Sequence, residues 1–164
     1  MVSYVEELTA VQGWVRELPG GDDVAVGAMV ETPSAALRAG ALARVSDFLS
    51  FGTNDLTQLV LGLSRDDVEP RLLPEYRRAG IVEVSPFDRL DRAVVDLVRL
   101  AVEGARAVRP DLPIGICGEQ AADEPSVAAA RAAGLDSVSC SPFRVPAARL
   151  AAGLAALVDD GPAG

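Results

Sequence analysis

The chain has 164 residues, of which 49% are hydrophobic and 4% aromatic, enough for one domain with an aliphatic core of Ala, Val and Leu. Its formal net charge is −9, with 24 acidic and 15 basic residues interspersed, which argues against a nucleic-acid-binding surface. His is absent and all 15 basic residues are Arg, so the chain contains no Ser-His-Asp triad, Cys-His pair or phosphohistidine. An acid, base or nucleophile must therefore be Asp, Glu, Cys, Tyr or Ser.

Cysteine content and hydropathy restrict the cellular setting. Cys117 and Cys140 are too few and too far apart for a disulfide framework, and the absence of His argues against zinc. No apolar run reaches the roughly 18 residues of a membrane span, and the first residues lack the basic-then-apolar pattern of a signal peptide. We expect a soluble, cytoplasmic protein that binds neither nucleic acid nor a membrane.

The first half of the chain shows alternating helical and strand patterns. Apolar residues at three-to-four spacing predict a helix over 5–18, and a Gly-Gly-Asp-Asp turn leads into a strand over 24–30. A helix is expected over 33–45, with Pro33 in its first turn, and a second strand over 47–51. The stretch 63–86 breaks the alternation and predicts a long excursion with one short amphipathic piece near 74–79.

The second half returns to the alternation. Helices are expected over 87–108, 125–133 and 146–158, and strands over 114–117 and 137–140. Repeated strand-helix units are typical of a parallel sheet, so the sequence predicts an α/β fold of four such units preceded by a helix. We expect a single domain over 1–164 whose Ala/Gly-rich tail frays from about residue 153.

Two carboxylates follow neighbouring predicted strands. Glu31 comes after the first strand and Asp55 after the second. The carboxyl ends of parallel strands hold the ligand site in α/β proteins, so both residues could share a hard divalent cation, with Mg²⁺ as the expected metal. Each could instead be an acid in the first turn of a helix, stabilised by backbone N–H groups. The residues alone leave both interpretations open.

Three further positions lie at the same predicted edge. Gly52-Thr53-Asn54 offers close backbone approach, a hydroxyl and a carboxamide for a phosphoryl or carboxylate oxygen, or is an ordinary turn. Cys117 could exchange a proton with a ligand or pack as an inert thiol, and Cys140 fits the inert interpretation better. Arg144 is either an anion contact or part of a surface ion pair.

Four runs carry a resemblance to a known family. They are Gly27-Ala28-Met29-Val30-Glu31-Thr32-Pro33-Ser34-Ala35, Phe48-Leu49-Ser50-Phe51-Gly52-Thr53-Asn54-Asp55-Leu56-Thr57-Gln58, Gly115-Ile116-Cys117-Gly118-Glu119, and Ser139-Cys140-Ser141-Pro142-Phe143-Arg144-Val145-Pro146. Their order resembles that in phosphoenolpyruvate-utilising enzymes, and the excursion and the ending are most similar to the pyruvate phosphate dikinases among them. The resemblance covers nearly all of 24–152.

The resemblance implies a role for each candidate residue. Glu31 and Asp55 would ligate Mg²⁺ and contact substrate. Gly52, Thr53 and Asn54 would contact phosphoenolpyruvate or pyruvate. Cys117 would donate the proton to the enolate carbon. The implied fold is the C-terminal half of a TIM-type (β/α)8 barrel.

The departures from the family matter equally. A whole barrel needs about 250 residues, and the family's phosphoryl-clamping arginines, phosphohistidine domain and nucleotide-binding domain have no counterpart here. Gln120-Ala121-Ala122 stands where these dikinases have His-Gly-Gly. We therefore expect a half-barrel that acts as a phosphotransferase only when completed, by a second copy in a homodimer or by a separate N-terminal half. The alternative is a non-catalytic oligomerisation or regulatory module.

Overall fold

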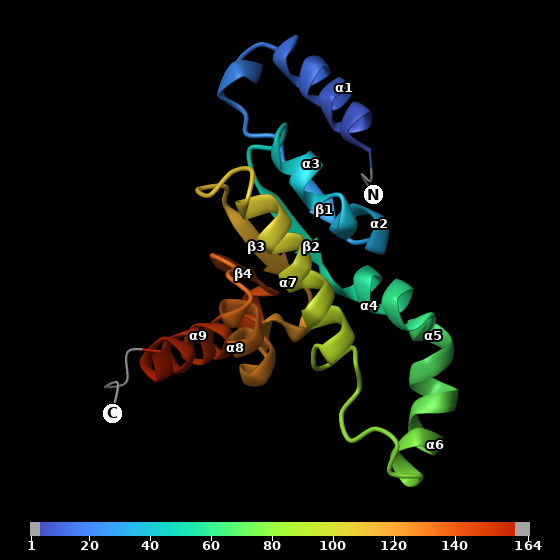
Figure 1. Cartoon of the computed structure of the whole chain (residues 1–164). Coiled ribbons are helices and arrows are strands. Elements are labelled where there is room, and N and C mark those ends of the chain that lie inside the picture. The colour runs from blue at the N-terminus through green and yellow to red at the C-terminus, as the bar shows by residue number, and fades with distance from the viewer. Residues whose placement is uncertain (1–3, 160–164) are drawn as a thin grey trace.

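The computed structural model describes residues 4–159, in which four short strands form one sheet (Figure 1). The strands are β1 (Ala28–Val30), β2 (Leu49–Gly52), β3 (Ile114–Cys117) and β4 (Ser137–Ser139). They lie in the order β1-β2-β3-β4, and every neighbouring pair is parallel. The predicted α/β fold with a four-stranded parallel sheet is confirmed for this part of the chain.

Helical segments connect the strands. The longer ones are α1 (Val5–Arg16), α4 (Thr53–Leu61), α7 (Arg92–Arg106), α8 (Glu124–Ala132) and α9 (Val145–Asp159). The shorter ones are η1 (Gly21–Asp23), α2 (Pro33–Leu37), α3 (Ala39–Ala43), α5 (Arg65–Asp67), η2 (Val68–Leu72), α6 (Leu73–Arg78), η3 (Glu119–Ala122) and η4 (Pro142–Arg144). None of the helices within residues 4–159 has the length and apolar composition needed to cross a bilayer.

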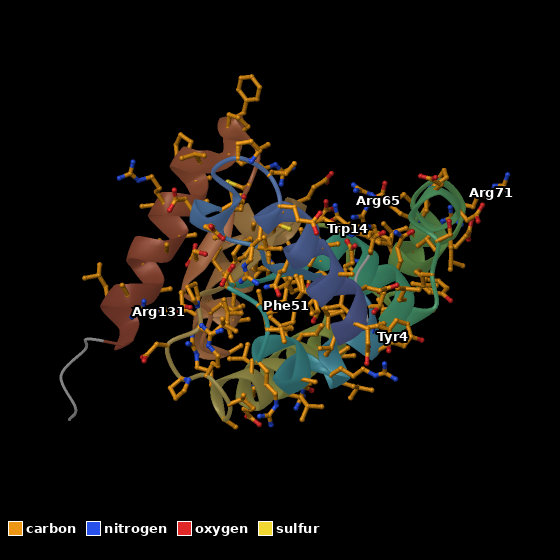
Figure 2. The ribbon with its side chains drawn as sticks, turned by 90° about the horizontal axis from the view of Figure 1, so that it is seen from above. Tyr4, Trp14, Phe51, Arg65, Arg71 and Arg131 are labelled. Carbon is orange, nitrogen blue, oxygen red and sulfur yellow. The ribbon has the colours of Figure 1, made fainter. Side chains whose placement is uncertain are left out.

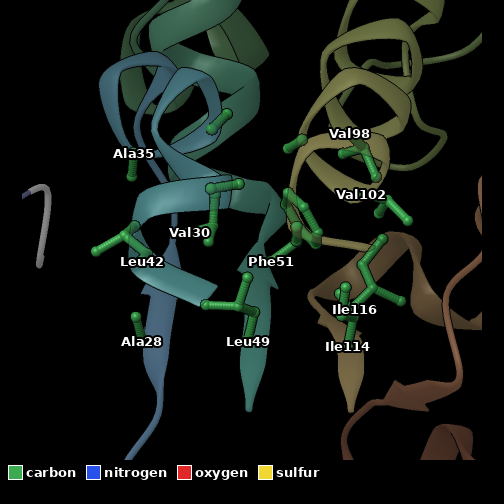
Figure 3. Packing of buried hydrophobic residues seen from close by; sticks show 14 of the residues in the cluster. Ala28, Val30, Ala35, Leu42, Leu49, Phe51, Val98, Val102, Ile114 and Ile116 are labelled. Carbon is green, nitrogen blue, oxygen red and sulfur yellow. The ribbon is translucent and has the colours of Figure 1, made fainter. Parts of the chain in front are cut away.

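Alternation along the strands separates the two faces of the sheet. In β2, Leu49 and Phe51 are 1% and 0% exposed, whereas Ser50 and Gly52 between and after them are half-buried. The same pattern holds in β3, where Ile114 and Ile116 are buried. Because successive side chains point to opposite faces, one face carries the apolar core, as Figure 3 shows.

Helix α7 covers the apolar face and approaches α3 closely. Its residues Val94, Val98 and Val102 are buried in the same cluster as the strand residues. A Cβ added to Gly40 of α3 would lie 2.8 Å from the carbonyl oxygen of Gly104 in α7. The absence of a side chain at Gly40 therefore permits the helices to pack nearer than a larger residue there would allow.

Side-chain caps explain where two helices begin, one later than the sequence predicts and one as predicted. The expected helix 87–108 begins only at Arg92, because the Asp91 carboxylate accepts a hydrogen bond from the Ala93 N–H at 2.8 Å. The expected helix 33–45 begins as predicted after Thr32, whose hydroxyl accepts from the Ala35 N–H. It is then divided into α2 and α3 at Arg38, and β1 is shorter than the predicted strand 24–30.

The excursion is more helical than the sequence predicted. Segments α5, η2 and α6 follow one another without a break and form an arm that projects away from the sheet (Figure 1). The arm has its own small core, in which Val68, Leu73 and Phe87 are buried. Figure 2 places Arg65 nearer the sheet and Arg71 toward the outer end of the arm.

The two ends of the described region are helical. At the first, the guanidinium of Arg38 lies 5.0 Å from the ring centroid of Tyr4, which precedes α1. At the second, α9 continues to Asp159, past the position at which we expect fraying. The fraying itself stays a prediction, and residues 160–164 lie outside the described residues.

Candidate functional site

The ends of β1 and β2 bring a carboxylate next to a glycine. A Cβ added to Gly52 would lie 3.0 Å from Oε2 of Glu31 and 2.9 Å from its Cβ. The absence of a side chain at Gly52 therefore leaves room for the carboxylate of Glu31 at the edge of the sheet. Gly52 also pairs with Cys117 at the end of β3. Three predicted site residues from three strands meet here.

Helix α4 begins at this edge. Gly52 precedes it with no side-chain cap, and Thr53, Asn54 and Asp55 form its first turn. The first N–H groups of a helix have no partner within the helix, so this end suits an anion. The Oδ1 atom of Asn54 is buried without a hydrogen-bond partner among the described residues, and Asp55 is exposed. An unpaired buried oxygen is a free acceptor for a ligand donor or a cation.

The thiol of Cys117 contacts a second sulfur atom. Its Sγ lies 3.7 Å from Sδ of Met29. Met29 stands between two buried residues of β1 and is 38% exposed, so it points to the face opposite the core. The sequence interpretation missed Met29, although its place in the alternating strand pattern was a usable signal. The thiol therefore lies on the open face of the sheet, above the end of β2.

The hydroxyl of Thr53 points into the protein rather than outward. Thr53 is 1% exposed, and its Oγ1 lies 2.7 Å from Oε1 of Gln120 and 3.0 Å from the carbonyl oxygen of Cys117. A hydroxyl has one proton, so these two acceptors share it. A ligand at this position would then contact the backbone N–H of Thr53. The predicted contact between substrate and Thr53 stays a prediction, with the backbone N–H rather than the hydroxyl as the contacting group.

An arginine of the arm is bound to the loop that follows Cys117. Arg65 donates two hydrogen bonds to the carboxylate of Glu119, at 3.1 and 2.8 Å, and its Nε lies 3.3 Å from Glu69. Arg144 donates to the backbone carbonyl of Glu119 at 2.9 Å, so it lies beside the same loop. The hydrogen bonds from Arg65 hold the pKa of Glu119 below its usual range. No sequence pattern predicts this pairing, because the two residues are 54 positions apart.

The Arg65–Glu119 pair predicts a specific pH dependence of stability. Because the pKa of Glu119 is lowered in the folded state, its contribution is present above the usual carboxyl range and is lost as pH falls through the folded-state pKa. The two side chains are 29% and 43% exposed, so solvent screening limits the contribution to under about 1 kcal/mol. Urea unfolding should show Glu119→Gln less stable than wild type at neutral pH and equal to it well below the carboxyl range.

A matched variant controls that measurement. Glu75 pairs with Arg78 at 2.6 Å, but those side chains are 63% and 70% exposed. Glu75→Gln should therefore change stability less than Glu119→Gln at neutral pH. Equal losses for the two variants, or a loss at Glu119 that persists in acid, would contradict the assignment.

A cavity of about 260 Å³ opens beside these residues. Its lining is formed by Asn54, Cys117, Gly118, Glu119, Ser139, Cys140, Ser141 and Arg144. A water molecule occupies about 30 Å³ of liquid, so a small organic anion fits. Cys140, expected to be inert within the last strand, instead follows β4 and is half-buried at this cavity.

The metal prediction concerns two carboxylates. Within residues 4–159, His, Cys, Asp and Glu nowhere gather in groups of three or more that could hold a metal ion. Glu31 lies over Gly52, and Asp55 stands three residues later in the first turn of α4. Carboxylate and amide oxygens are the donor types that Mg²⁺ uses, usually with several waters retained. The donor set present therefore fits this ion in kind.

The parallel sheet and the residues at its edge, Glu31, Gly52 and Cys117, are accompanied by a match to a known family. The chain belongs to the PEP-utilising enzymes: it matches the family described as "PEP-utilising enzyme, PEP-binding domain" over residues 1–156. Among curated relatives, it is 56% identical over 128 residues to pyruvate, phosphate dikinase 1, chloroplastic, of Oryza sativa subsp. japonica, covering 77% of this chain and 13% of that protein.

Bacterial relatives are similarly close. The chain is 53% identical over 133 residues to pyruvate, phosphate dikinase of Clostridium symbiosum, covering 80% of this chain and 15% of that protein. For the Rhizobium meliloti dikinase the identity is 50% over 136 residues, covering 82% and 15%. The resemblance to the dikinases is confirmed, and the chain spans only about one seventh of these relatives. The expected cytoplasmic location stays a prediction.

Proposed function

We propose that this chain supplies the phosphoenolpyruvate and pyruvate site of a dikinase-type phosphotransferase. The observation that carries the proposal is the meeting of Glu31, Gly52 and Cys117 at one edge of the sheet, beside the first turn of α4. In this proposal Glu31 and Asp55 hold Mg²⁺. When bound, the ion supplies positive charge beside the enolate and phosphoryl oxygens.

In this proposal, groups of the chain itself bind the ligand, orient it and transfer the proton. The N–H groups of the first turn of α4 bind the anionic ligand, and Gly52 lets it approach the backbone. Oδ1 of Asn54, which has no partner among the described residues, orients the ligand or the ion. The thiol of Cys117 holds the proton that the enolate carbon receives, and as thiolate it would remove a methyl proton from pyruvate in reverse.

The proposed architecture is the C-terminal half of a TIM-type barrel. Within residues 4–159, β1 and β4 each pair along one side only, and Ser137 and Ser139 of β4 are exposed. Unpaired strand edges are positions at which further strands add. We propose that the remaining strands come from an N-terminal barrel half, or from a second copy of this chain in a homodimer, and that turnover requires them.

Calorimetry tests the ligand site without requiring turnover. Titrating phosphoenolpyruvate with Mg²⁺ into the chain should release heat, and Glu31→Gln or Asp55→Asn should weaken binding about tenfold or more by removing one of two anionic ligands. Gly52→Ala should weaken it also, because the new Cβ would displace the Glu31 carboxylate. The matched control is Asp111→Asn, an exposed aspartate at the opposite end of β3, which should bind as wild type.

Three outcomes would count against the proposal or a part of it. Absence of heat with the chain alone and with an N-terminal barrel half added would favour a non-catalytic oligomerisation or regulatory module. Binding that Glu31→Gln and Asp55→Asn leave unchanged would place the ligand elsewhere. Pyruvate formation that survives Cys117→Ala would remove Cys117 from the proton-transfer role.

A further inference from the structure

Gln120 is a buried amide whose two ends are both bonded. It is 0% exposed and follows Cys117 by three residues, in η3. Its Nε2 donates to the carbonyl oxygen of Pro86 at 3.1 Å, and its Oε1 accepts from the hydroxyl of Thr53 at 2.7 Å. A carbonyl oxygen can only accept, so the amide nitrogen must face Pro86. This fixes the orientation of the side chain.

The amide joins three segments that are distant in sequence. Thr53 begins α4, Pro86 ends the excursion, and Gln120 lies in the loop after β3. The Thr53 hydroxyl also lies 3.0 Å from the carbonyl oxygen of Cys117. Gln120 is therefore connected to the backbone of Cys117 through the hydroxyl of Thr53.

On one side, the loop after Cys117 packs closely against Thr53 and Gln120. Gly118 has a φ of +151°, and a Cβ added there would lie 2.0 Å from Oγ1 of Thr53 and 2.9 Å from Oε1 of Gln120. The backbone after Cys117 thus passes directly against the Thr53–Gln120 hydrogen bond. Loss of that bond would free the loop to move toward the cavity that Asn54, Cys117 and Gly118 line.

We propose that Gln120 is a positioning residue for Cys117. It holds the Thr53 hydroxyl, which with Gly118 fixes the backbone of Cys117 and thereby directs the thiol toward Met29 and the ligand face. The inference rests on the proposed role of Cys117 in proton transfer. Gln120 touches no ligand, and its effect passes through Thr53. At this position the amide uses one N–H as a donor to Pro86 and its carbonyl oxygen as an acceptor from Thr53.

The rate at which iodoacetamide alkylates Cys117 in the full chain reports the position of its thiol. Cleavage after Arg131 separates the peptides of Cys117 and Cys140, so mass spectrometry measures both rates in one sample. Gln120→Leu keeps a similar shape and loses both hydrogen bonds. We expect it to raise the Cys117 rate about fivefold, the factor corresponding to one hydrogen bond, and to leave the Cys140 rate within twofold.

Variants at Thr53 test whether the effect passes through its hydroxyl. Thr53→Val removes the hydroxyl at nearly constant shape and should raise the Cys117 rate by a similar factor. Thr53→Ser keeps the hydroxyl and should restore the wild-type rate. Adding Gln120→Leu to Thr53→Val should change the rate by less than about twofold, because the hydrogen bond between Thr53 and Gln120 is then already absent.

A glutamine at the other end of the domain supplies the matched control. Gln12 is 6% exposed and donates to the carbonyl oxygen of Val45. Gln12→Leu makes the same chemical change and should leave the Cys117 rate at the wild-type value. An equal rise in Gln12→Leu would show that only general loosening is measured, which would overturn the proposal.

The remaining outcomes separate this proposal from the proposed function. Unchanged Cys117 rates in both Gln120→Leu and Thr53→Val, with circular dichroism showing a folded chain, would overturn positioning by Gln120. Effects that multiply fully in the double variant would overturn the route through Thr53. Failure of phosphoenolpyruvate to bind would contradict the proposed function but not the positioning role of Gln120, since alkylation measures the thiol without the ligand.

Discussion

Replacing Phe51 with alanine should lower the free energy of unfolding by about 3–5 kcal/mol. Phe51 is 0% exposed, lies in the central part of β2 and packs against the residues of α7 and of the neighbouring strands (Figure 3). Truncation removes a whole ring and leaves a cavity that the backbone of a four-stranded sheet cannot close. Domains of this size are stable by about 5–15 kcal/mol, so the loss endangers the fold. Urea unfolding followed by circular dichroism measures it.

The control for that measurement is the same substitution on the surface. Phe143 in η4 is 97% exposed, so Phe143→Ala removes an equal ring from water rather than from a core. Its effect should stay within about 0.5 kcal/mol. A loss at Phe143 comparable to that at Phe51 would contradict the core described here.

Gly118→Ala should cost about 3 kcal/mol or more. The φ of +151° is one that side-chain-bearing residues rarely adopt, and the added Cβ would come within 2.0 Å of the Thr53 hydroxyl. Backbone strain of this kind costs about 1–3 kcal/mol, and forced overpacking adds a similar amount. Thermal unfolding of the variant should therefore begin at a clearly lower temperature than that of wild type.

A second glycine should respond with the opposite sign. Gly13 lies within α1, is exposed, and has no atom within 4 Å of an added Cβ. Gly13→Ala should raise stability by about 0.5–1 kcal/mol, because glycine loses more backbone freedom than alanine on entering a helix. Losses of equal size at both positions would show that the conformation at Gly118 is not what the structure describes.

The sheet was predictable because alternation and strand ends are local properties. Each apolar run overlaps the strand that the structure shows, although β2 extends one residue past the predicted strand 47–51, and β3 has the predicted bounds. The split at Arg38 and the late start of α7 at Arg92 depend on capping and packing, which a periodic pattern averages away. In the arm, α6 matches the short amphipathic piece predicted near 74–79, whereas α5 and η2 were not predicted, because their helical turns are short and are held by contacts with Phe87 on the far side of a loop.

Some residues of the candidate site could be predicted from the sequence, and others could not. Residues directly after strands, such as Glu31 and Cys117, were predictable because parallel strands end at one edge. The contacts of Met29, Gln120 and Arg65 were not predicted, although Gln120 stood out as a departure from the family, since each depends on a partner at least 34 residues away, in a different element. The roles of the predicted residues toward substrate and Mg²⁺ stay predictions until binding is measured.

Strand β2 contributes both to the core and to the candidate site. Phe51, the largest ring in the core, and Gly52, the gap in which Glu31 lies, are consecutive, so the pleat that buries one presents the other. A slip of one residue that carried Phe51 to the place of Gly52 would put a ring against the Glu31 carboxylate and the small, polar Ser50 in the core. A ligand bound at Gly52 therefore also locks the register of β2, and its binding and the melting temperature of the chain are thermodynamically linked.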